Sequence, residues 1–511
     1  MRAFMRLGFV FIFVFGWSTG AEILAILPFR GKSHFLVFEP LLDQLSRRGH
    51  HVTVASYFPK AEPFPNYTDV SFVDEKDHRP VKGFYDFKSF ESLKPSVMNN
   101  MRLIYGLEAE YDRLFTLPEF MDLQRRKFDL VITEYFSSDV HFGLVYKIGA
   151  PYILLSTCQH FPWQSYAAGD SIDPSYISHP FSAHPVKKNF LERLQNTVEV
   201  FGTVAVYDQL FRRNEQILAE KYLGPLPKLR DIANNASVYM IHSHFSIHGL
   251  KPTMPNSVQI GGITVKPPKP LPQKLQKVLD ESKGVIYFSM GSVLKGDSMS
   301  MNKQKAFIKV FSELKQTVLW KRETPLEEKV NNIVTNGWFP QRDILAHPKV
   351  QLFISHGGLL STNEAVTSGV PMVVVPMFGD QHHNAKALES IGFAVSVDFN
   401  SLTEDDLRQA VNKVLNDPSY KENARKTKEA FLDRPMSPLD TAVYWVEYVI
   451  RHKGAPHLRS AARDMTWYQY HNLDVYASLA LMAYFAYLIV KNILKFLLGL
   501  CCGRVNKHKT E

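Results

Sequence analysis

One short segment constrains the fold of this chain more than any other, and its core reads FISHGGLLSTNEAVTSGVPMVVVPMFGDQ. The apolar run Leu352–Ile354 predicts a buried strand, and His356–Gly358 predicts a tight turn. Ser361–Ser368 predicts a short helix that ends at Gly369. Glycines let the backbone approach a bound group, while unpaired N–H groups and the positive end of a helix dipole favour an anion. The segment therefore predicts a phosphate-binding turn between a strand and a helix.

The same alternation of strand and helix extends along most of the chain. The first half carries predicted strands and one clear amphipathic helix: strands Glu22–Pro28, His51–Ala55, Phe128–Thr133 and Tyr152–Ser156, and helix Leu36–Arg48. A second run of alternating elements begins with the strand Gly284–Met290 and continues to about Val397. Such alternation is typical of doubly wound parallel sheets. The chain is therefore predicted to form two similar α/β lobes.

The boundary between the lobes is predicted at residues 266–272, where four of seven residues are proline. Such a composition makes a stiff linker. The first lobe is then expected to span residues 21–265 and the second lobe residues 273–455, followed by a juxtamembrane stretch at 456–474.

Both ends of the chain carry segments typical of membrane targeting. Residues 1–20 combine two arginines, an apolar run and small residues, which predicts a secretory signal peptide. Residues 475–500 are mostly apolar and long enough to span a bilayer. Basic residues follow this span in the tail 501–511, so the tail is predicted to be cytosolic and the lobes luminal. We thus expect a type I single-span protein in a lipid bilayer.

The net charge of +9 does not indicate nucleic-acid binding. The signal segment holds two of these charges and the tail after Val490 a net four, so three remain for the rest of the chain.

Of the three cysteines, only Cys158 lies before the predicted span, so no disulfide within the luminal part is expected. Two sequons, at Asn66 and Asn235, are candidate glycosylation sites.

The glycine turn is one part of a longer pattern that resembles the signature of the UDP-glycosyltransferase family. The matching residues are Trp338, Gln341, His356, Gly358, Glu364, Asp380 and Gln381. The resemblance covers nearly the whole chain, including both ends, and is greatest to the membrane-bound insect members. It implies the GT-B architecture, in which two Rossmann-like lobes face a cleft. It also implies that the helix Leu439–Arg451 crosses back onto the first lobe.

The resemblance implies roles for the polar and aromatic residues of the signature. Trp338 would stack on uracil and Gln341 would hydrogen-bond the nucleoside. Glu364 would bind the ribose hydroxyls, since a carboxylate can accept from two neighbouring hydroxyl groups. Asp380 and Gln381 would bind the sugar.

The diphosphate would be bound without a metal, because histidine and backbone N–H groups can donate to its oxygens. The implied donors are His356 and Ser361 beside Gly358, with Ser292 in a second strand-to-turn element as a further candidate. Many family members have asparagine four residues after the histidine, whereas this chain has Leu360. That departure leaves more of the phosphate binding to Ser361 and the backbone. No metal or other cofactor is expected.

The predicted chemistry is transfer of a sugar to an alcohol, which needs a base for the acceptor proton. His34 follows the first strand, at the carboxyl edge where α/β folds bind ligands, and matches the catalytic histidine of the family. A carboxylate would orient its ring. Many relatives have aspartate after the strand that ends at Thr133, whereas this chain has Glu134; Asp139 is the alternative partner.

The resulting hypothesis is an inverting UDP-glycosyltransferase of the endoplasmic reticulum. It would move glucose from UDP-glucose to small lipophilic alcohols or phenols, as in detoxification. A UDP-glucuronosyltransferase is the enzymatic alternative, and a lipophile-binding protein on the same fold is the alternative without catalysis.

Lys507 and Lys509 have the spacing of a dilysine retrieval signal, although a cluster of charges that only sets topology explains them too. Association into homo-oligomers stays open.

Overall fold

A computed structural model describes residues 20–73, 96–104, 108–292, 294, 298–327 and 329–505. The chain up to Arg459 forms one compact unit, and the chain from Ser460 forms a second. The predicted signal segment, apart from Gly20, and the dilysine positions Lys507 and Lys509 lie outside the described residues.

The first lobe is built on a parallel sheet of seven described strands in the order β3-β2-β1-β4-β5-β6-β7. The strands are β1 Glu22–Leu27, β2 His51–Ser56, β3 Tyr67–Ser71, β4 Leu130–Glu134, β5 Tyr152–Ser156, β6 Val238–Ile241 and β7 Ser257–Gln259. The helices are α1 Lys32–Arg47, α3 Val97–Ile104, α4 Glu108–Leu114, α5 Pro118–Asp122, α6 Phe142–Ile148, α7 Pro162–Ala168, α8 Phe190–Val206, α9 Arg212–Leu223, α10 Leu229–Asn234 and α11 Phe245–His248. Strand order reverses direction between β1 and β4, which leaves a crevice at their carboxyl ends.

The second lobe repeats this plan with six described strands in the order β10-β9-β8-β11-β12-β13. They are β8 Val285–Ser289, β9 Thr317–Lys321, β10 Ile333–Asn336, β11 Val350–Ser355, β12 Met372–Val374 and β13 Ala394–Ser396. The helices are α12 Gln273–Glu281, α13 Met301–Ser312, α14 Gln341–Leu345, α15 Leu359–Ser368, α16 Gln381–Ser390, α17 Glu404–Asn416 and α18 Pro418–Leu432. Here the order reverses between β8 and β11. The predicted pair of doubly wound parallel sheets is confirmed.

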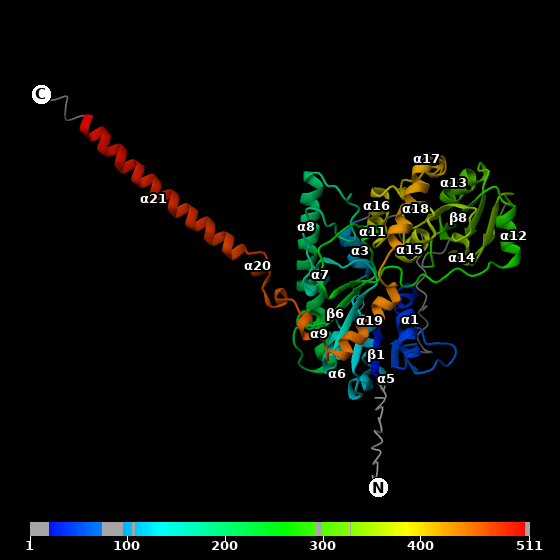
Figure 1. The fold of residues 1–511 in the computed structure, drawn as a ribbon, viewed down its shortest axis with the longest axis horizontal. Helices are drawn as coiled ribbons and strands as arrows, with labels where there is room; N and C mark the ends of the chain where they lie inside the picture. Colours follow the sequence, from blue (N-terminus) through cyan, green and yellow to red (C-terminus); the bar gives the residue numbers. More distant parts are fainter. Residues whose placement is uncertain are drawn as a thin grey trace, which may run out of the picture. The chain divides into compact units, whose positions relative to one another are not determined.

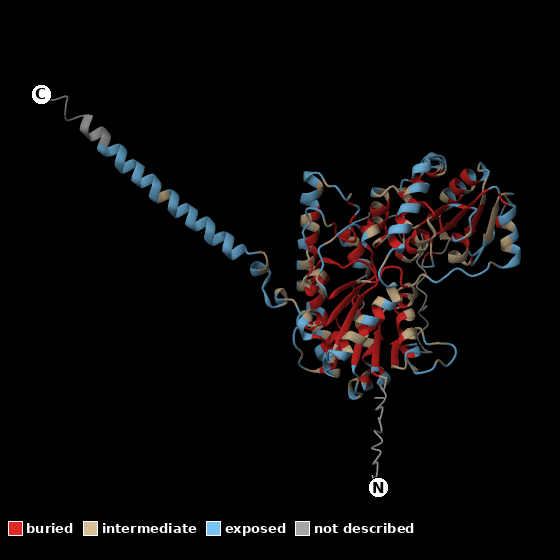
Figure 2. Cartoon of the chain, viewed as in Figure 1, coloured by how far each residue is buried: buried red, intermediate tan, exposed pale blue. Residues whose placement is uncertain are grey.

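The central strands of both sheets are buried on both faces, and Figure 2 shows them as the buried centre of each lobe. Alternate residues of one strand serve opposite faces. In β1, Leu24 and Ile26 join the core on one side, while Ile23 and Ala25 join a core with α1 on the other. Near-continuous apolar runs are what such strands require, which is why the sequence revealed them.

The chain returns to the first lobe after finishing the second. Helix α19, Pro438–Arg451, contacts α1, and its valines enter the apolar core between α1 and the first sheet (Figure 1). The Arg48 guanidinium donates to the Glu447 carboxylate at 2.6 Å. This crossing, implied by the family resemblance, places a helix of the second half on the first lobe.

The second unit consists of short turns, the helix α20 Trp467–Tyr470 and the long helix α21 Leu473–Val505. Within α21, residues Leu473–Leu500 form one helix that is long and apolar enough to cross a membrane. The predicted span 475–500 lies inside it.

Candidate active site

His34 and Glu134 meet at the switch point of the first sheet. His34 is the third residue of α1, which begins four residues earlier than predicted because Gly31 ends the connection from β1 in an extended conformation. Glu134 is the last residue of β4, the strand beside β1. The His34 Nδ1 atom lies 2.5 Å from Glu134 Oε1. The two side chains can therefore form a base and an orienting carboxylate.

Thr157 is a third member of this group that the sequence did not single out. Its Oγ1 atom lies 2.7 Å from His34 Nδ1 and 3.2 Å from Glu134 Oε1. Thr157 directly follows β5, so its position at the same sheet edge was the available signal. With Nδ1 facing Glu134 and Thr157, Nε2 is the ring nitrogen that can accept a proton from a substrate.

Aromatic rings enclose the histidine. The rings of Phe29 and Phe136 each have their centroid 4.4 Å from that of His34. Gly31 permits this packing, because a Cβ there would come within 2.5 Å of the Phe29 ring. The candidate base therefore faces an apolar and aromatic environment.

Asp139, the alternative partner of His34, lies in a different cluster. Its carboxylate accepts from Arg212 Nε at 2.8 Å and from Tyr207 Oη at 2.9 Å. Nearby Glu215 accepts from the Asp139 backbone N–H at 3.1 Å, and burial beside Asp139 raises the pKa of Glu215 to about 8. Glu134 therefore contacts His34, whereas Asp139 pairs with the buried Arg212 guanidinium.

The predicted phosphate-binding turn surrounds His356 at the switch point of the second sheet. The turn follows β11, and α15 begins directly after Gly358 and ends at Gly369, which has a φ of 71°. A Cβ at Gly291, which follows β8, would lie 2.6 Å from the His356 ring, and one at Gly358 would lie 2.4 Å from it. Ser292 is exposed next to Gly291. Both glycines are therefore needed to admit the ring.

The His356 ring is neutral near pH 7. Burial in the turn, with a smaller contribution from Lys321, lowers its pKa to about 4. A neutral imidazole donates one hydrogen bond, so it can contact a phosphate oxygen without carrying a charge.

Gln341 and Glu364, predicted to bind the nucleoside, hydrogen-bond each other. Gln341 Nε2 donates to Glu364 Oε2 at 2.7 Å and lies 3.0 Å from Ser361 Oγ. Burial raises the pKa of Glu364, and the Gln341 bond opposes this rise. Trp338 is 70% exposed, which leaves its indole accessible to a base.

Asp380 and Gln381 begin α16. Asp380 Oδ2 accepts from Asn384 Nδ2 at 3.0 Å, and burial raises the pKa of the Asp380 carboxyl. Gln381 Oε1 accepts from the backbone N–H groups of Met377 and Phe378 at 2.9 and 3.2 Å. The Gln381 oxygen is thereby used by the loop, and its NH₂ group is the part suited to bind a substrate.

Side chains of the two lobes contact each other beside these residues. Leu360, where many relatives have asparagine, packs against the core cluster of the first lobe that contains α1 and α19. Asn363 Nδ2 lies 3.1 Å from His242 Nε2, and Asn384 Oδ1 lies 3.0 Å from His248 Nε2. Leu360 thus serves interlobe packing instead of a polar contact.

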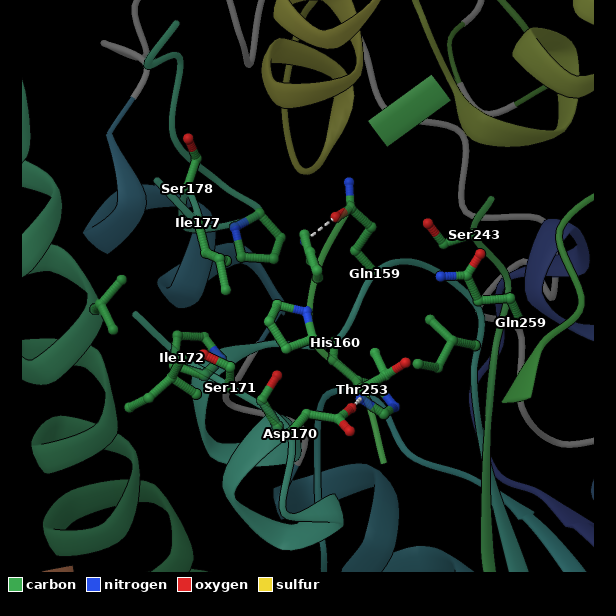
Figure 3. A pocket seen from close by; sticks show the side chains of 17 residues that line it. Gln159, His160, Asp170, Ser171, Ile172, Ile177, Ser178, Ser243, Thr253 and Gln259 are labelled. Carbon is green, nitrogen blue, oxygen red and sulfur yellow. Dashed lines mark hydrogen bonds and ion pairs between the residues drawn. The ribbon is translucent and has the colours of Figure 1, made fainter. Parts of the chain in front are cut away.

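A small cavity of about 40 Å³ lies in the first lobe beyond β5 and β6. Figure 3 shows Gln159, His160 and Asp170 at its wall, and His160 Nδ1 lies 3.4 Å from Asp170 Oδ2. Lys251, also in the wall, donates to Gln159, and burial lowers the pKa of Lys251 to about 8. Drug-sized ligands need several hundred Å³, so this cavity alone does not accommodate an acceptor.

The remaining predicted site residues are the two sequons. Asn66 is exposed before β3, with a φ of 54°. Asn235 is half-buried, and the hydroxyl of its sequon residue Ser237 is buried and donates to the Gly454 carbonyl at 2.7 Å. Of the two asparagines, Asn66 is the more exposed in the folded protein.

Across the described residues, no group of three or more His, Cys, Asp or Glu side chains has the geometry to hold a metal ion.

Comparison with known proteins decides the family. The sequence model described as "UDP-glucoronosyl and UDP-glucosyl transferase" matches residues 23–508. The chain belongs to this UDP-glycosyltransferase family. It is 41% identical to "UDP-glycosyltransferase UGT5" of Dactylopius coccus, an alignment that covers 96% of this chain and 95% of that protein.

Two further comparisons define what this UDP-glycosyltransferase resembles. It is 33% identical to "UDP-glucuronosyltransferase 1A1" of Homo sapiens, over 97% of this chain and 95% of that protein. Among solved structures, the glycotransferase of kitacinnamycin is similar in fold, with a TM-score of 0.54 and 17% identity over 85% of this chain and 99% of that one. The predicted GT-B fold and transferase activity are thereby confirmed, and the alternative of a protein without catalysis is not supported.

Proposed function

We propose that this UDP-glycosyltransferase transfers glucose from UDP-glucose to hydroxyl groups of small lipophilic molecules, with His34 as the base. The observation that carries this proposal is the 2.5 Å contact between His34 Nδ1 and Glu134 Oε1 at the sheet edge. The choice of glucose is supported by a relative from Dactylopius coccus named "UDP-glucosyltransferase 2", which is 39% identical over 94% of each chain.

The proposed reaction is a single displacement. His34 Nε2 accepts the proton of the acceptor hydroxyl while the acceptor oxygen forms a bond to the anomeric carbon. The bond from that carbon to the phosphate oxygen breaks on the opposite face, so the configuration inverts and UDP leaves as an anion. Glu134, on the other ring nitrogen, stabilises the imidazolium that forms.

The leaving group would be stabilised by the turn around His356. One N–H of the neutral His356 ring and the backbone N–H groups at the start of α15 are donors to phosphate oxygens. The Ser361 hydroxyl accepts from Gln341 and keeps its own proton to donate. Ser292 is a further donor in this proposal. Because these donors suffice for a diphosphate in principle, we propose a reaction without metal, and full activity in excess EDTA is the expected result.

The remaining substrate contacts follow the family signature. Trp338 would stack on uracil, and Glu364, oriented by Gln341, would accept from the ribose hydroxyls. Asp380 would accept from sugar hydroxyls, while the Gln381 NH₂ group would donate to them. Within the protein, Gln381 Oε1 already accepts from the Met377 N–H and Asp380 Oδ2 from Asn384. The proposed sugar contacts use the other polar atoms of these two side chains.

The lipophilic nature of the acceptor is supported by the rings around the base. Phe29 and Phe136 flank His34. A phenol or other apolar alcohol could therefore pack against aromatic rings when it approaches Nε2. Part of the aromatic-rich segment 60–125 lies outside the described residues.

A donor and acceptor screen tests this function. Microsomes containing the protein are incubated with UDP-glucose or UDP-glucuronic acid and a panel of phenols, and the products are identified by mass. Hexosides are expected from UDP-glucose. Glucuronides alone would make this a glucuronosyltransferase, the activity named for the human relative. Absence of product with every donor and acceptor pair would contradict the proposal.

For location, we propose anchorage in the endoplasmic reticulum membrane through α21, with the lobes in the lumen and the C-terminus in the cytosol. The apolar stretch Leu473–Leu500 and the basic residues that follow it support this orientation. The double substitution Lys507→Ser and Lys509→Ser should release the protein to later compartments, seen as loss of high-mannose glycans. Retention of early glycans in that variant would show that the lysines are not a retrieval signal.

A further inference from the structure

A side chain of the first lobe reaches the loop of the second lobe that precedes Asp380. Asn100 lies in α3 and is only 2% exposed. Its Oδ1 atom accepts from the backbone N–H of Gly379 at 2.9 Å. The residue next to the candidate sugar-binding carboxylate is therefore held by the opposite lobe.

This contact determines how the Asn100 amide is oriented. A backbone N–H can only donate, so the oxygen must face Gly379 and the NH₂ group must face elsewhere. The Asn100 Nδ2 atom is buried and has no hydrogen-bond partner. Buried amide groups in folded proteins are almost always paired, so an unpaired donor at this position calls for a partner that binds later.

The neighbouring loop explains which partner fits. Asp380 can only accept once ionised, and the Gln381 oxygen is already used by the backbone of Met377 and Phe378. A sugar hydroxyl that donates to Asp380 still has lone pairs to accept with. The Asn100 NH₂ group, beside the same loop, can donate to that hydroxyl.

We propose that Asn100 Nδ2 donates a hydrogen bond to a hydroxyl oxygen of the donor sugar, so that the first lobe takes part in recognising the sugar. This inference rests on the proposed role of Asp380 and Gln381. One amide then performs two tasks: Oδ1 fixes the loop through Gly379, and Nδ2 binds the sugar that the loop receives. UDP, which lacks the sugar, cannot use this contact.

Two substitutions separate the tasks. Asn100→Asp keeps an acceptor for the Gly379 N–H but removes the donor, whereas Asn100→Ala removes both. The measured quantities are the KM for UDP-glucose and the inhibition constant of UDP. We expect Asn100→Asp to raise the KM roughly 5- to 10-fold, as for the loss of one hydrogen bond, while the UDP constant changes less than about 2-fold. Asn100→Ala should raise the KM at least as much.

Asn99→Asp is the matched control, because it adds the same charge one position away on α3. It should leave both constants within about 2-fold of the unsubstituted enzyme. The inference is overturned if Asn100→Asp leaves the KM unchanged, if it weakens UDP as much as UDP-glucose, or if Asn99→Asp has an equal effect.

Asp380→Asn distinguishes this inference from the function on which it rests. If Asp380→Asn weakens UDP-glucose selectively while Asn100→Asp does not, only the role of Asn100 is wrong. If Asp380→Asn has no effect that depends on the sugar, the proposed sugar site itself is wrong, and the inference fails with it.

Discussion

The two lobes share one fold but assemble their functional side chains differently. In the second lobe, the candidate donor-binding residues other than Ser292 lie within the single stretch from Trp338 to Gln381. In the first lobe, His34, Glu134 and Thr157 come from three separate segments. The contact between His34 and Glu134 and the turn around His356 nevertheless each lie at the switch point of their sheet, between β1 and β4 and between β8 and β11. The comparison teaches that a fold supplies the place for a site, whether its residues are adjacent or distant in sequence.

The difference predicts distinct consequences of substitution. Changes to His34 and Glu134 in the first lobe should affect the chemical step, and changes to the signature residues of the second lobe should affect donor binding.

The largest effect is expected for His34→Ala. Loss of the base should lower turnover by about 100-fold or more, while binding of UDP-sugar stays within a few fold. Turnover and donor binding are measured separately, by product formation and by competition with UDP. His51→Ala, which changes an exposed histidine at the start of β2, is the control and should retain activity. Unchanged turnover in His34→Ala would remove this residue from the mechanism.

Substitutions of Glu134 and Asp139 should affect turnover and stability differently. Glu134→Gln should lower turnover roughly 10-fold or more with little loss of thermal stability, because a neutral amide stabilises the imidazolium poorly. Asp139→Asn should instead lower the free energy of unfolding by about 3 kcal/mol, because it leaves the buried Arg212 guanidinium undercompensated. Activity and thermal unfolding are compared for both variants. The reverse ranking of turnover would transfer the orienting role to Asp139.

On the donor side, Glu364→Ala should raise the KM for UDP-sugar by roughly 10-fold, as expected for losing hydrogen bonds to a carboxylate. The KM for acceptor should barely change, which serves as the internal control. Steady-state kinetics with each substrate varied in turn provides the measurement. A shift in the acceptor constant instead would contradict the division of labour between the lobes.

The cluster around Asp139 should also make the stability of the fold depend on pH. The pKa of Glu215 is raised to about 8 in the folded protein from an ordinary value of 4.5. Between these values the folded state keeps a proton that the unfolded state has released, so stability should fall as pH rises, by at most about 1.4 kcal/mol per pH unit. Glu215→Gln should flatten this dependence in thermal unfolding between pH 5 and about 8. Glu220→Gln, an exposed change on the same helix, should not.

The sequence predictions were accurate where the residues of a site lie within one stretch, and incomplete where residues from distant segments meet. The turn around His356 and the helix ended by Gly369 were predictable because glycine and apolar runs act locally. The choice between Glu134 and Asp139 was not predictable, because both lie near the end of β4 and only the contact with Arg212 of α9 shows how Asp139 is used. Thr157 could be found only from its position directly after β5, and Asn100 gave no local signal, since each acts through a residue far away in sequence.

The sequence by itself therefore determined the family, the two parallel sheets, the apolar C-terminal span and the contiguous donor signature, because each of these rests on patterns read within one stretch of chain. Only the tertiary structure decided which acid contacts the histidine, why Leu360 replaces a polar residue, and which side chain of the first lobe holds the loop before Asp380. Each of these contacts joins residues that are distant in sequence. Folding brings them together, and a hydrogen bond forms only when its two groups are close in space.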